Sequence, residues 1–171
     1  MLIGLMGMLS ACQPESTLTL SGLDKQNFQR VVDGDTTELV VLKNKQGMEA
    51  CITNYGARLV SLMVPDRNGK MEDVVTGFPT IDEYMSQNQN FGATVGRYIG
   101  RIMGPSFVID SVAYQLQGFG KAKHISHGGK PGFANRIWKV EKVTDRSVLL
   151  SYLSPNGENG FPGNLQVYLT Y

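Results

Sequence analysis

Short runs in which hydrophobic residues alternate with polar ones cover most of the chain from Thr37 onward. They are rich in β-branched residues and are separated by turn signals about every 8–12 residues, which is typical of an all-β sandwich or barrel. Strands do not alternate with long helical patterns, and no G-x-G-x-x-G motif follows a strand, so a nucleotide-binding fold is not expected. The expected strands lie within residues 38–44, 49–55, 57–65, 106–117, 136–143, 147–155 and 164–171.

Turn residues separate several of these runs. The stretches "NKQG" and "DRNGK" predict hairpin turns, and Asn68-Gly69 is the strongest signal because both residues tolerate positive φ. A further turn at Asp110-Ser111 divides the range 106–117 into two short strands.

Helical signals are weak along the whole chain. Only "TIDEYMSQ" at residues 80–87 predicts a short helix, with Thr80 as its N-cap. The stretch "FGATVGRYIGRIMG" places a glycine at every fourth position, and each glycine would cost a helix about 1 kcal/mol relative to alanine. We therefore expect extended or looped backbone here, which carries Arg97 and Arg101 to a particular place.

Composition and charge narrow the function further. The chain has 171 residues, which suits one domain or a piece of a larger one. It has 16 basic and 15 acidic residues, for a formal charge of +1, so no global field attracts nucleic acid or anionic lipid. Charged residues make up only 18% of the chain and glycine occurs 20 times, which suits a β-rich domain with tight turns.

The first residues differ from everything that follows. "MLIGLMGMLSAC" carries no charge and is too short to span a bilayer, which needs about 20 apolar residues. Its length and small residues predict a secretory signal over 1–12, although the usual basic start is missing, and "LSAC" resembles the lipobox of bacterial lipoproteins. Lipidation of Cys12, a polar tether over 13–34 and export to the periplasm or cell surface are therefore expected. The alternative is a buried apolar strand with an incidental cysteine.

The remaining cysteine and the histidines are few. If Cys12 is lipidated, Cys51 is left alone, no intramolecular disulfide forms, and we expect a small buried hydrophobe. Both histidines lie in "KHISHGGKPGF", as His124 and His127, without the cysteine or acidic neighbours of a zinc site. Glycines after His127 let a ligand approach the backbone. A surface histidine in a flexible loop fits the spacing equally well.

Four blocks together resemble the aldose 1-epimerases, the galactose mutarotases. They are "NYGARLVSLMVPDRNGKMEDVVTGF", "FGATVGRYIGRI", "HGGKPGF" with a following tryptophan, and "SPNGENGFPGNLQVYLTY", in the family's order and spacing over residues 35–171. The resemblance implies a large antiparallel β-sandwich, present as its N-terminal half, that binds a hexose such as galactose or glucose. It implies an isomerase that interconverts α and β anomers by acid–base ring opening and closure, without cofactor or metal.

The resemblance also implies roles for single residues. Arg101 matches the arginine that hydrogen-bonds sugar hydroxyls, and His127 matches the histidine that lies against the sugar near its ring oxygen. Gly100 stands where the family usually has asparagine, which removes one polar contact in the substrate-binding set. Arg97 is expected to be structural, and Trp138 to belong to the core rather than to stack on a sugar.

The family's general acid, a histidine, and general base, a glutamate, fall beyond Tyr171. The resemblance therefore implies that neither member of the catalytic pair is present, and that the chain is the N-terminal part of a longer enzyme. The alternatives are a non-catalytic carbohydrate-binding lipoprotein, an inactive fragment, or a purely structural surface domain. A half-sandwich would expose an inner apolar face, which a homodimer could cover. The sequence does not identify the preferred sugar, and no single residue excludes hexose 6-phosphates as substrates.

Overall fold

The computed structural model describes residues 18–87, 89–118 and 123–171. The predicted signal segment, the predicted lipidation site Cys12 and the first residues of the predicted tether lie outside these ranges. Antiparallel strands dominate the described chain, as the sequence predicted, and no described helix is long and apolar enough to cross a bilayer. In chain order the elements are η1 (Lys25–Phe28), β1 (Arg30–Val32), β2 (Asp35–Thr37), β3 (Leu39–Lys43), β4 (Glu49–Thr53), β5 (Arg58–Pro65), β6 (Met71–Asp73), α1 (Ile81–Gln87), β7 (Arg101–Met103), β8 (Ser106–Ile109), β9 (Val112–Gln115), β10 (His124–Ser126), η2 (Phe133–Asn135), β11 (Lys139–Thr144), β12 (Ser147–Ser154), η3 (Glu158–Gly160) and β13 (Leu165–Thr170).

Strands β3, β4, β5 and β6 form an antiparallel sheet in chain order. The hairpin between β5 and β6 is the one predicted from "DRNGK": Asp66 Oδ1 accepts the backbone N–H groups of Asn68, at 2.7 Å, and Lys70, at 2.9 Å. Of the pair Asn68-Gly69, only Gly69 adopts positive φ, at 81°. The hairpins predicted at "NKQG", between β3 and β4, and at "DRNGK", between β5 and β6, are both confirmed.

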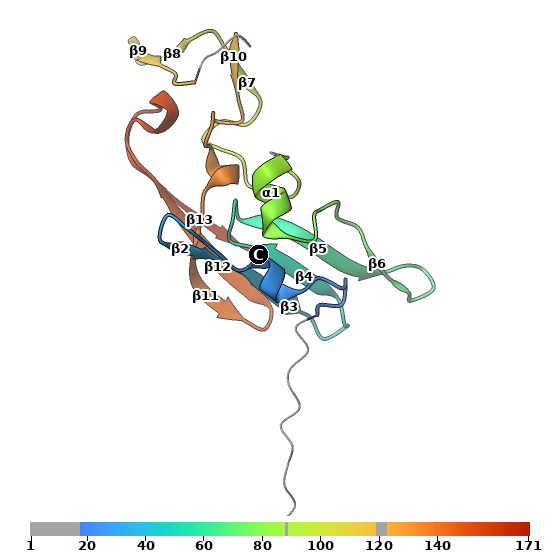
Figure 1. The fold of residues 1–171 in the computed structure, drawn as a ribbon. Coiled ribbons are helices and arrows are strands. Elements are labelled where there is room, and N and C mark those ends of the chain that lie inside the picture. The colour runs from blue at the N-terminus through green and yellow to red at the C-terminus, as the bar shows by residue number, and fades with distance from the viewer. Residues whose placement is uncertain (1–17, 88, 119–122) are drawn as a thin grey trace, which may run out of the picture.

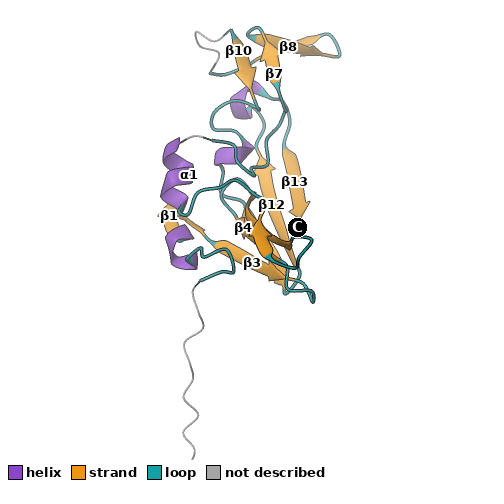
Figure 2. Cartoon of the chain, turned by 90° about the vertical axis from the view of Figure 1, so that its right-hand side faces the viewer, coloured by secondary structure: helices purple, strands orange, loops and turns teal. Residues whose placement is uncertain are grey.

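This sheet is buried on both faces because alternate residues point into two different cores. Val40 and Ile52 pack with residues of the second sheet, whereas Leu39 packs with side chains of α1 and η1 on the opposite face. Figures 1 and 2 show α1 and η1 on one side of the sheet and strands β12 and β13 on the other. The arrangement is therefore layered, with the first sheet in the middle.

The second sheet has the order β11-β12-β13, again antiparallel. Its central strand β12 pairs Leu150 with Val140 on one side and with Leu169 on the other. Trp138, just before β11, is fully buried in the core shared by both sheets. The expectation that Trp138 belongs to the core is thus confirmed.

Cys51 lies in the core between the first sheet and the helices. It is a free cysteine with no exposed surface, as predicted. Burial, together with the nearby charge of Glu49, raises the pKa of its thiol to about 12. A thiol that keeps its proton is a poor nucleophile, so Cys51 acts as a small hydrophobe.

Helix α1 begins as the sequence predicted. Thr80 Oγ1 accepts the N–H of Glu83 at 3.3 Å, while the Thr80 hydroxyl donates to Glu83 Oε2 at 2.8 Å. The N-terminal part of the described chain was not predicted to have regular structure. It contains η1, with Phe28 fully buried, and β1, which pairs with β2. Three- and four-residue elements leave no periodic pattern, so sequence periodicity could not find them.

Four short strands lie together at one end of the molecule, away from the two larger sheets (Figure 1). Strands β8 and β9 form the hairpin predicted around Asp110-Ser111, and both turn residues have positive φ, 48° and 66°. Strand β10 pairs with β7, so that Ser126 lies opposite Arg101. This second pairing joins residues 91–104, here called the arginine segment, to residues 124–132, here called the histidine loop.

Candidate functional site

The arginine segment is looped up to Gly100 and extended from Arg101, as the sequence predicted. Its glycines allow close contact with other backbone. A Cβ atom on Gly128 would lie 1.7 Å from the carbonyl oxygen of Gly96, and a Cβ on Gly96 would lie 2.2 Å from the Phe133 ring. Only glycine at both positions lets the histidine loop lie directly against the arginine segment.

His127 follows the end of β10 in an unusual backbone conformation. Its φ is 52°, and Gly128 and Gly129 continue in the left-handed region at 83° and 91°. A non-glycine residue is uncommon there and requires support from its surroundings. The turn is closed by a hydrogen bond of 3.1 Å from the Gly129 N–H to the Ser126 carbonyl.

Gly100 and His127 are joined by two hydrogen bonds. The His127 backbone N–H donates to the Gly100 carbonyl at 2.8 Å, and the Gly100 N–H donates to His127 Nδ1 at 3.3 Å. Because Nδ1 accepts, the neutral imidazole carries its proton on Nε2. His127 therefore keeps an N–H donor on the side of the ring away from Gly100.

Arg101 lies at the first position of β7, directly opposite Ser126, with its side chain exposed. Within the described ranges, its guanidinium has no hydrogen-bond or ion-pair partner. A guanidinium offers five donors in a planar fork, which suits adjacent hydroxyl groups. Strand pairing thus brings the backbones at the two predicted sugar-binding residues together, although the residues lie far apart in sequence, and Arg101 does not line the cleft beside His127.

A small cleft of ≈ 110 Å³ lies beside His127. Ligand pockets usually measure about 300–1,000 Å³, so the cleft would hold only part of a hexose. A more apolar hollow of ≈ 310 Å³, lined in part by Leu59 and Tyr171, includes neither Arg101 nor His127. The polar lining of the small cleft comes from Asn90, Ser126, His127, Lys130 and Asn135.

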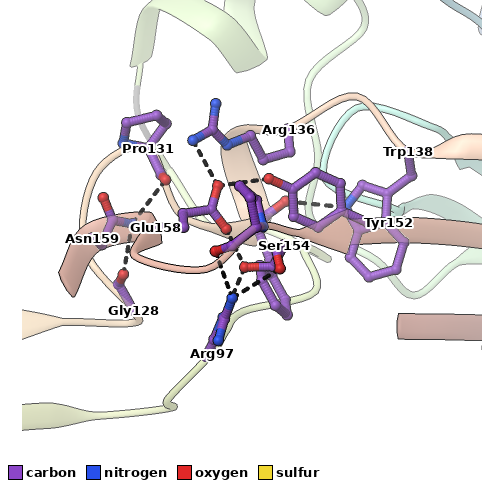
Figure 3. Close-up of polar contacts among 11 residues, drawn as sticks. Arg97, Gly128, Pro131, Arg136, Trp138, Tyr152, Ser154, Glu158 and Asn159 are labelled. Atoms are coloured by element: carbon purple, nitrogen blue, oxygen red, sulfur yellow. Dashed lines mark hydrogen bonds and ion pairs between the residues drawn. The ribbon is translucent and has the colours of Figure 1, made fainter. Parts of the chain in front are cut away.

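Arg97 ties the arginine segment to the loop that follows β12 (Figure 3). Its Nε donates to Ser154 Oγ at 2.8 Å, and its terminal nitrogens donate to the carbonyls of Ser154, Pro155 and Pro162 at 2.8–2.9 Å. A guanidinium used in this way has little capacity left for a ligand. The contacts agree with the structural role expected for Arg97.

Glu158 anchors the same loop from the other side. It accepts the Tyr152 hydroxyl at 2.6 Å and the Arg136 guanidinium at 2.7 Å, and it also accepts the Ser154 hydroxyl. Its side chain is only 6% exposed. Burial and the hydrogen bond to Glu158 raise the pKa of Tyr152 well above its usual range, so the phenol stays a donor.

Asn159, the next residue, reaches the histidine loop. Its side chain is buried, and Nδ2 donates to the Gly128 carbonyl at 2.8 Å and to the Pro131 carbonyl at 2.9 Å. Its backbone also has positive φ, 52°, and its carbonyl accepts the Gln117 N–H at 3.0 Å. Figure 3 shows this amide between the two carbonyl groups.

Sequence reasoning missed Arg136, Glu158 and Asn159 as individual residues. Glu158 and Asn159 lie within the block "SPNGENGFPG", which was used only as part of the family resemblance. In the described part of the chain, no three His, Cys, Asp or Glu side chains gather closely enough to hold a metal ion. What the site offers is hydrogen-bond donors on Arg101 and His127, which can bind hydroxyl groups.

Comparison with known proteins identifies the same family that the sequence blocks resemble, the aldose 1-epimerases. A family model described as aldose 1-epimerase matches residues 38–171. The galactose mutarotase of Rattus norvegicus is 36% identical over 138 residues, which is 81% of this chain and 40% of that protein. The aldose 1-epimerase of Escherichia coli (strain K12) is 32% identical over 139 residues, again 81% of this chain and 40% of that protein.

Solved structures agree. A GalM/aldose epimerase homologue from C. elegans superposes with a TM-score of 0.74 at 35% identity, covering 79% of this chain and 41% of that one. Galactose 1-epimerase from Lactobacillus acidophilus NCFM gives 0.72 at 26% identity, covering 83% and 42%. The fold is the N-terminal part of a galactose mutarotase fold, as expected.

The chain belongs to the aldose 1-epimerase family. It spans about 40% of the length of the curated relatives given above.

Proposed function

We propose that this chain supplies the sugar-binding part of an aldose 1-epimerase that interconverts the α and β anomers of hexoses such as galactose or glucose. The observation that carries the proposal is that the backbone segments holding Arg101 and His127 are joined to each other. The pairing of β7 with β10 sets Arg101 opposite Ser126, and two hydrogen bonds join Gly100 to His127. Membership of the aldose 1-epimerase family supports the reaction.

In this proposal the two side chains hold the sugar and do not move its protons. The Arg101 fork donates to neighbouring hydroxyl groups, and His127 Nε2–H donates toward the ring oxygen. Ring opening needs a base that removes the anomeric proton and an acid that protonates the ring oxygen. The resemblance assigns both to residues beyond Tyr171, so the complete reaction is proposed for the longer protein.

Gly100 supports one alternative, a carbohydrate-binding protein without catalysis. The family's usual asparagine would add a polar side chain here, whereas Gly100 contributes only backbone groups. Both of its backbone hydrogen-bonding groups are already engaged by His127. The alternative keeps the same ligand and the same two binding side chains, so only a rate above that in buffer would separate the enzyme from it.

The test of the proposal combines polarimetry with a binding titration. We expect freshly dissolved α-galactose to shift the NMR signals of the His127 imidazole and to lose optical rotation no faster with the chain than in buffer, because the proposal gives the chain binding groups and no proton-transfer pair. Replacing Arg101 by Ala should weaken binding about 10- to 100-fold, since a hydrogen bond to a charged group contributes about 1.5–3 kcal/mol. An added rate that His127→Ala abolishes would instead show that the chain catalyses the reaction alone.

Arg67→Ala is the matched control because Arg67 is an exposed arginine in the β5–β6 turn, and this variant should behave like the natural chain. A buffer-like rate with binding that depends on Arg101 is the result expected both of the sugar-binding part of an enzyme and of the non-catalytic alternative. A buffer-like rate with no response of His127 to galactose would contradict both functions.

Export as a lipoprotein anchored at Cys12 is a second part of the proposal. It is supported by the uncharged stretch that ends in "LSAC" and by the abrupt change to polar sequence after it. Acyl chains on Cys12 would hold the protein at a membrane surface, and more than one chain is needed for stable anchoring.

In bacteria fed a clickable palmitate analogue, we expect labelling of the natural chain and none of Cys12→Ala. Cys51→Ala is the matched control and should keep the label, because the Cys51 thiol is buried in the folded domain. Equal labelling of the Cys12→Ala variant would contradict the anchor.

A further inference from the structure

Three chain segments that are distant in sequence meet around His127, and each pair of segments is joined by its own contacts. The arginine segment contacts the histidine loop through Gly100. The same arginine segment contacts the loop after β12 through Arg97. The loop after β12 contacts the histidine loop through the side chain of Asn159.

The histidine loop has little structure of its own to hold it in place. Three consecutive residues, from His127 to Gly129, lie in the left-handed region of φ, where no helix or ladder can form. The Gly128 carbonyl lies within this stretch and the Pro131 carbonyl just after it, and both accept from one buried amide, that of Asn159. An amide NH₂ group has two donors, so the two carbonyls use its whole donor capacity.

The backbone around Asn159 is held in place by contacts of its two neighbours, Glu158 and Gly160. Glu158 beside it accepts from Tyr152, Ser154 and Arg136. Gly160 beyond it lies against the backbone of β9, where a Cβ would be 2.0 Å from the Gln115 carbonyl oxygen. The amide therefore projects from a rigid support.

We propose that Asn159 is a positioning residue for His127, which acts through the carbonyls of Gly128 and Pro131. It holds the histidine loop so that the backbone of His127 meets Gly100, and the imidazole then presents Nε2–H to the ligand. The role in sugar binding rests on the proposed function, whereas the positioning of His127 does not.

The test uses two substitutions of Asn159 in the full chain. Asn159→Asp keeps the shape and tolerates positive φ, but it removes both donors and sets a carboxyl group against two carbonyls. Asn159→Gly removes the amide without adding charge and also tolerates the backbone conformation, so it serves if the aspartate variant fails to fold. Asn164→Asp is the matched control: Asn164 lies in the same loop and accepts the Asn156 N–H through Oδ1, an atom that aspartate retains.

Amide hydrogen exchange gives the readout that does not depend on a sugar. We expect the Gly100 and His127 amides to exchange at least about tenfold faster in both Asn159 variants, relative to Leu150 in the centre of β12, because each bond lost contributes about 1 kcal/mol. Asn164→Asp should leave the ratio unchanged. Unchanged exchange at Gly100 and His127 in both variants would overturn the inference.

The second readout is the dissociation constant of galactose, followed at the His127 imidazole signals. This constant should rise roughly five- to tenfold in the Asn159 variants and stay the same in Asn164→Asp. Natural affinity in both Asn159 variants would overturn the role in binding. If even the natural chain shows no response to galactose, the proposed function fails, while the exchange measurement still decides the role of Asn159.

Discussion

An Arg58→Met variant is expected to be less stable than the natural chain by about 3–5 kcal/mol. Arg58, at the start of β5, has no exposed surface, and burial lowers the pKa of its guanidinium. It donates to the carbonyl of Gln89 at 2.8 Å, to that of Phe91 at 3.2 Å, and to that of Ala134 at 2.7 Å. Methionine fills a similar volume but leaves these carbonyls without their charged donor.

The aromatic rings around Arg58 add to this effect. Its guanidinium carbon lies 5.4 Å from the ring centre of Tyr55 and 5.1 Å from that of Tyr84, within the range of cation–π attraction. The free energy of unfolding would be measured by urea denaturation. Arg67→Met, at an exposed arginine, is the control and should stay within about 0.5 kcal/mol. Equal unfolding midpoints for the two variants would contradict the role given to Arg58.

Replacing Trp138 by Ala is expected to cost about 3–5 kcal/mol through loss of buried area and formation of a cavity. Its ring meets Phe133 edge-on at 5.9 Å between ring centres and lies 5.7 Å from Tyr152. Its Nε1–H donates to the Phe133 carbonyl at 3.2 Å. Trp138→Phe should cost less, because it keeps a buried ring and loses mainly the N–H donor.

Circular dichroism is the suitable probe for the Trp138 variants, because Trp138 is the single tryptophan of the chain and its fluorescence disappears with it. Tyr98→Ala removes an aromatic residue that is 49% exposed and serves as the control. A loss of stability for Trp138→Ala no larger than for Tyr98→Ala would show that the ring does not hold the two sheets together.

Much of the fold could be predicted because its longer strands carry local signals. Strands β3, β4, β5, β12 and β13 are five to eight residues long and rich in hydrophobic residues, and their turns contain the residues that positive φ demands. The pairing of β7 with β10 could not be predicted, because each strand has three residues and the partners are far apart in the chain. Pairing between distant short strands leaves no periodic signal in either of them.

The residues of the candidate site also divide into those that could be predicted from the sequence and those that could not. Arg101 and His127 were found through the family resemblance, while spacing alone left His127 open as a surface residue. In the sequence Arg58 was only one position of an expected strand. Its role as a buried donor could not be predicted, because its carbonyl partners come from the segments before Arg97 and after His127. Asn159 gave no signal of its own, because an asparagine followed by a glycine is equally typical of an ordinary turn.

The three segments that meet around His127 also bear on the order in which the chain folds. The contact from Arg97 to Ser154 spans 57 positions, and that from Asn159 to Gly128 spans 31. Closing a long loop costs conformational entropy, and no favourable contact offsets this cost until the two ends have met. The β3–β4 and β8–β9 hairpins close much shorter loops. We therefore expect the hairpins to form early and the proposed sugar-binding site around His127 to form late.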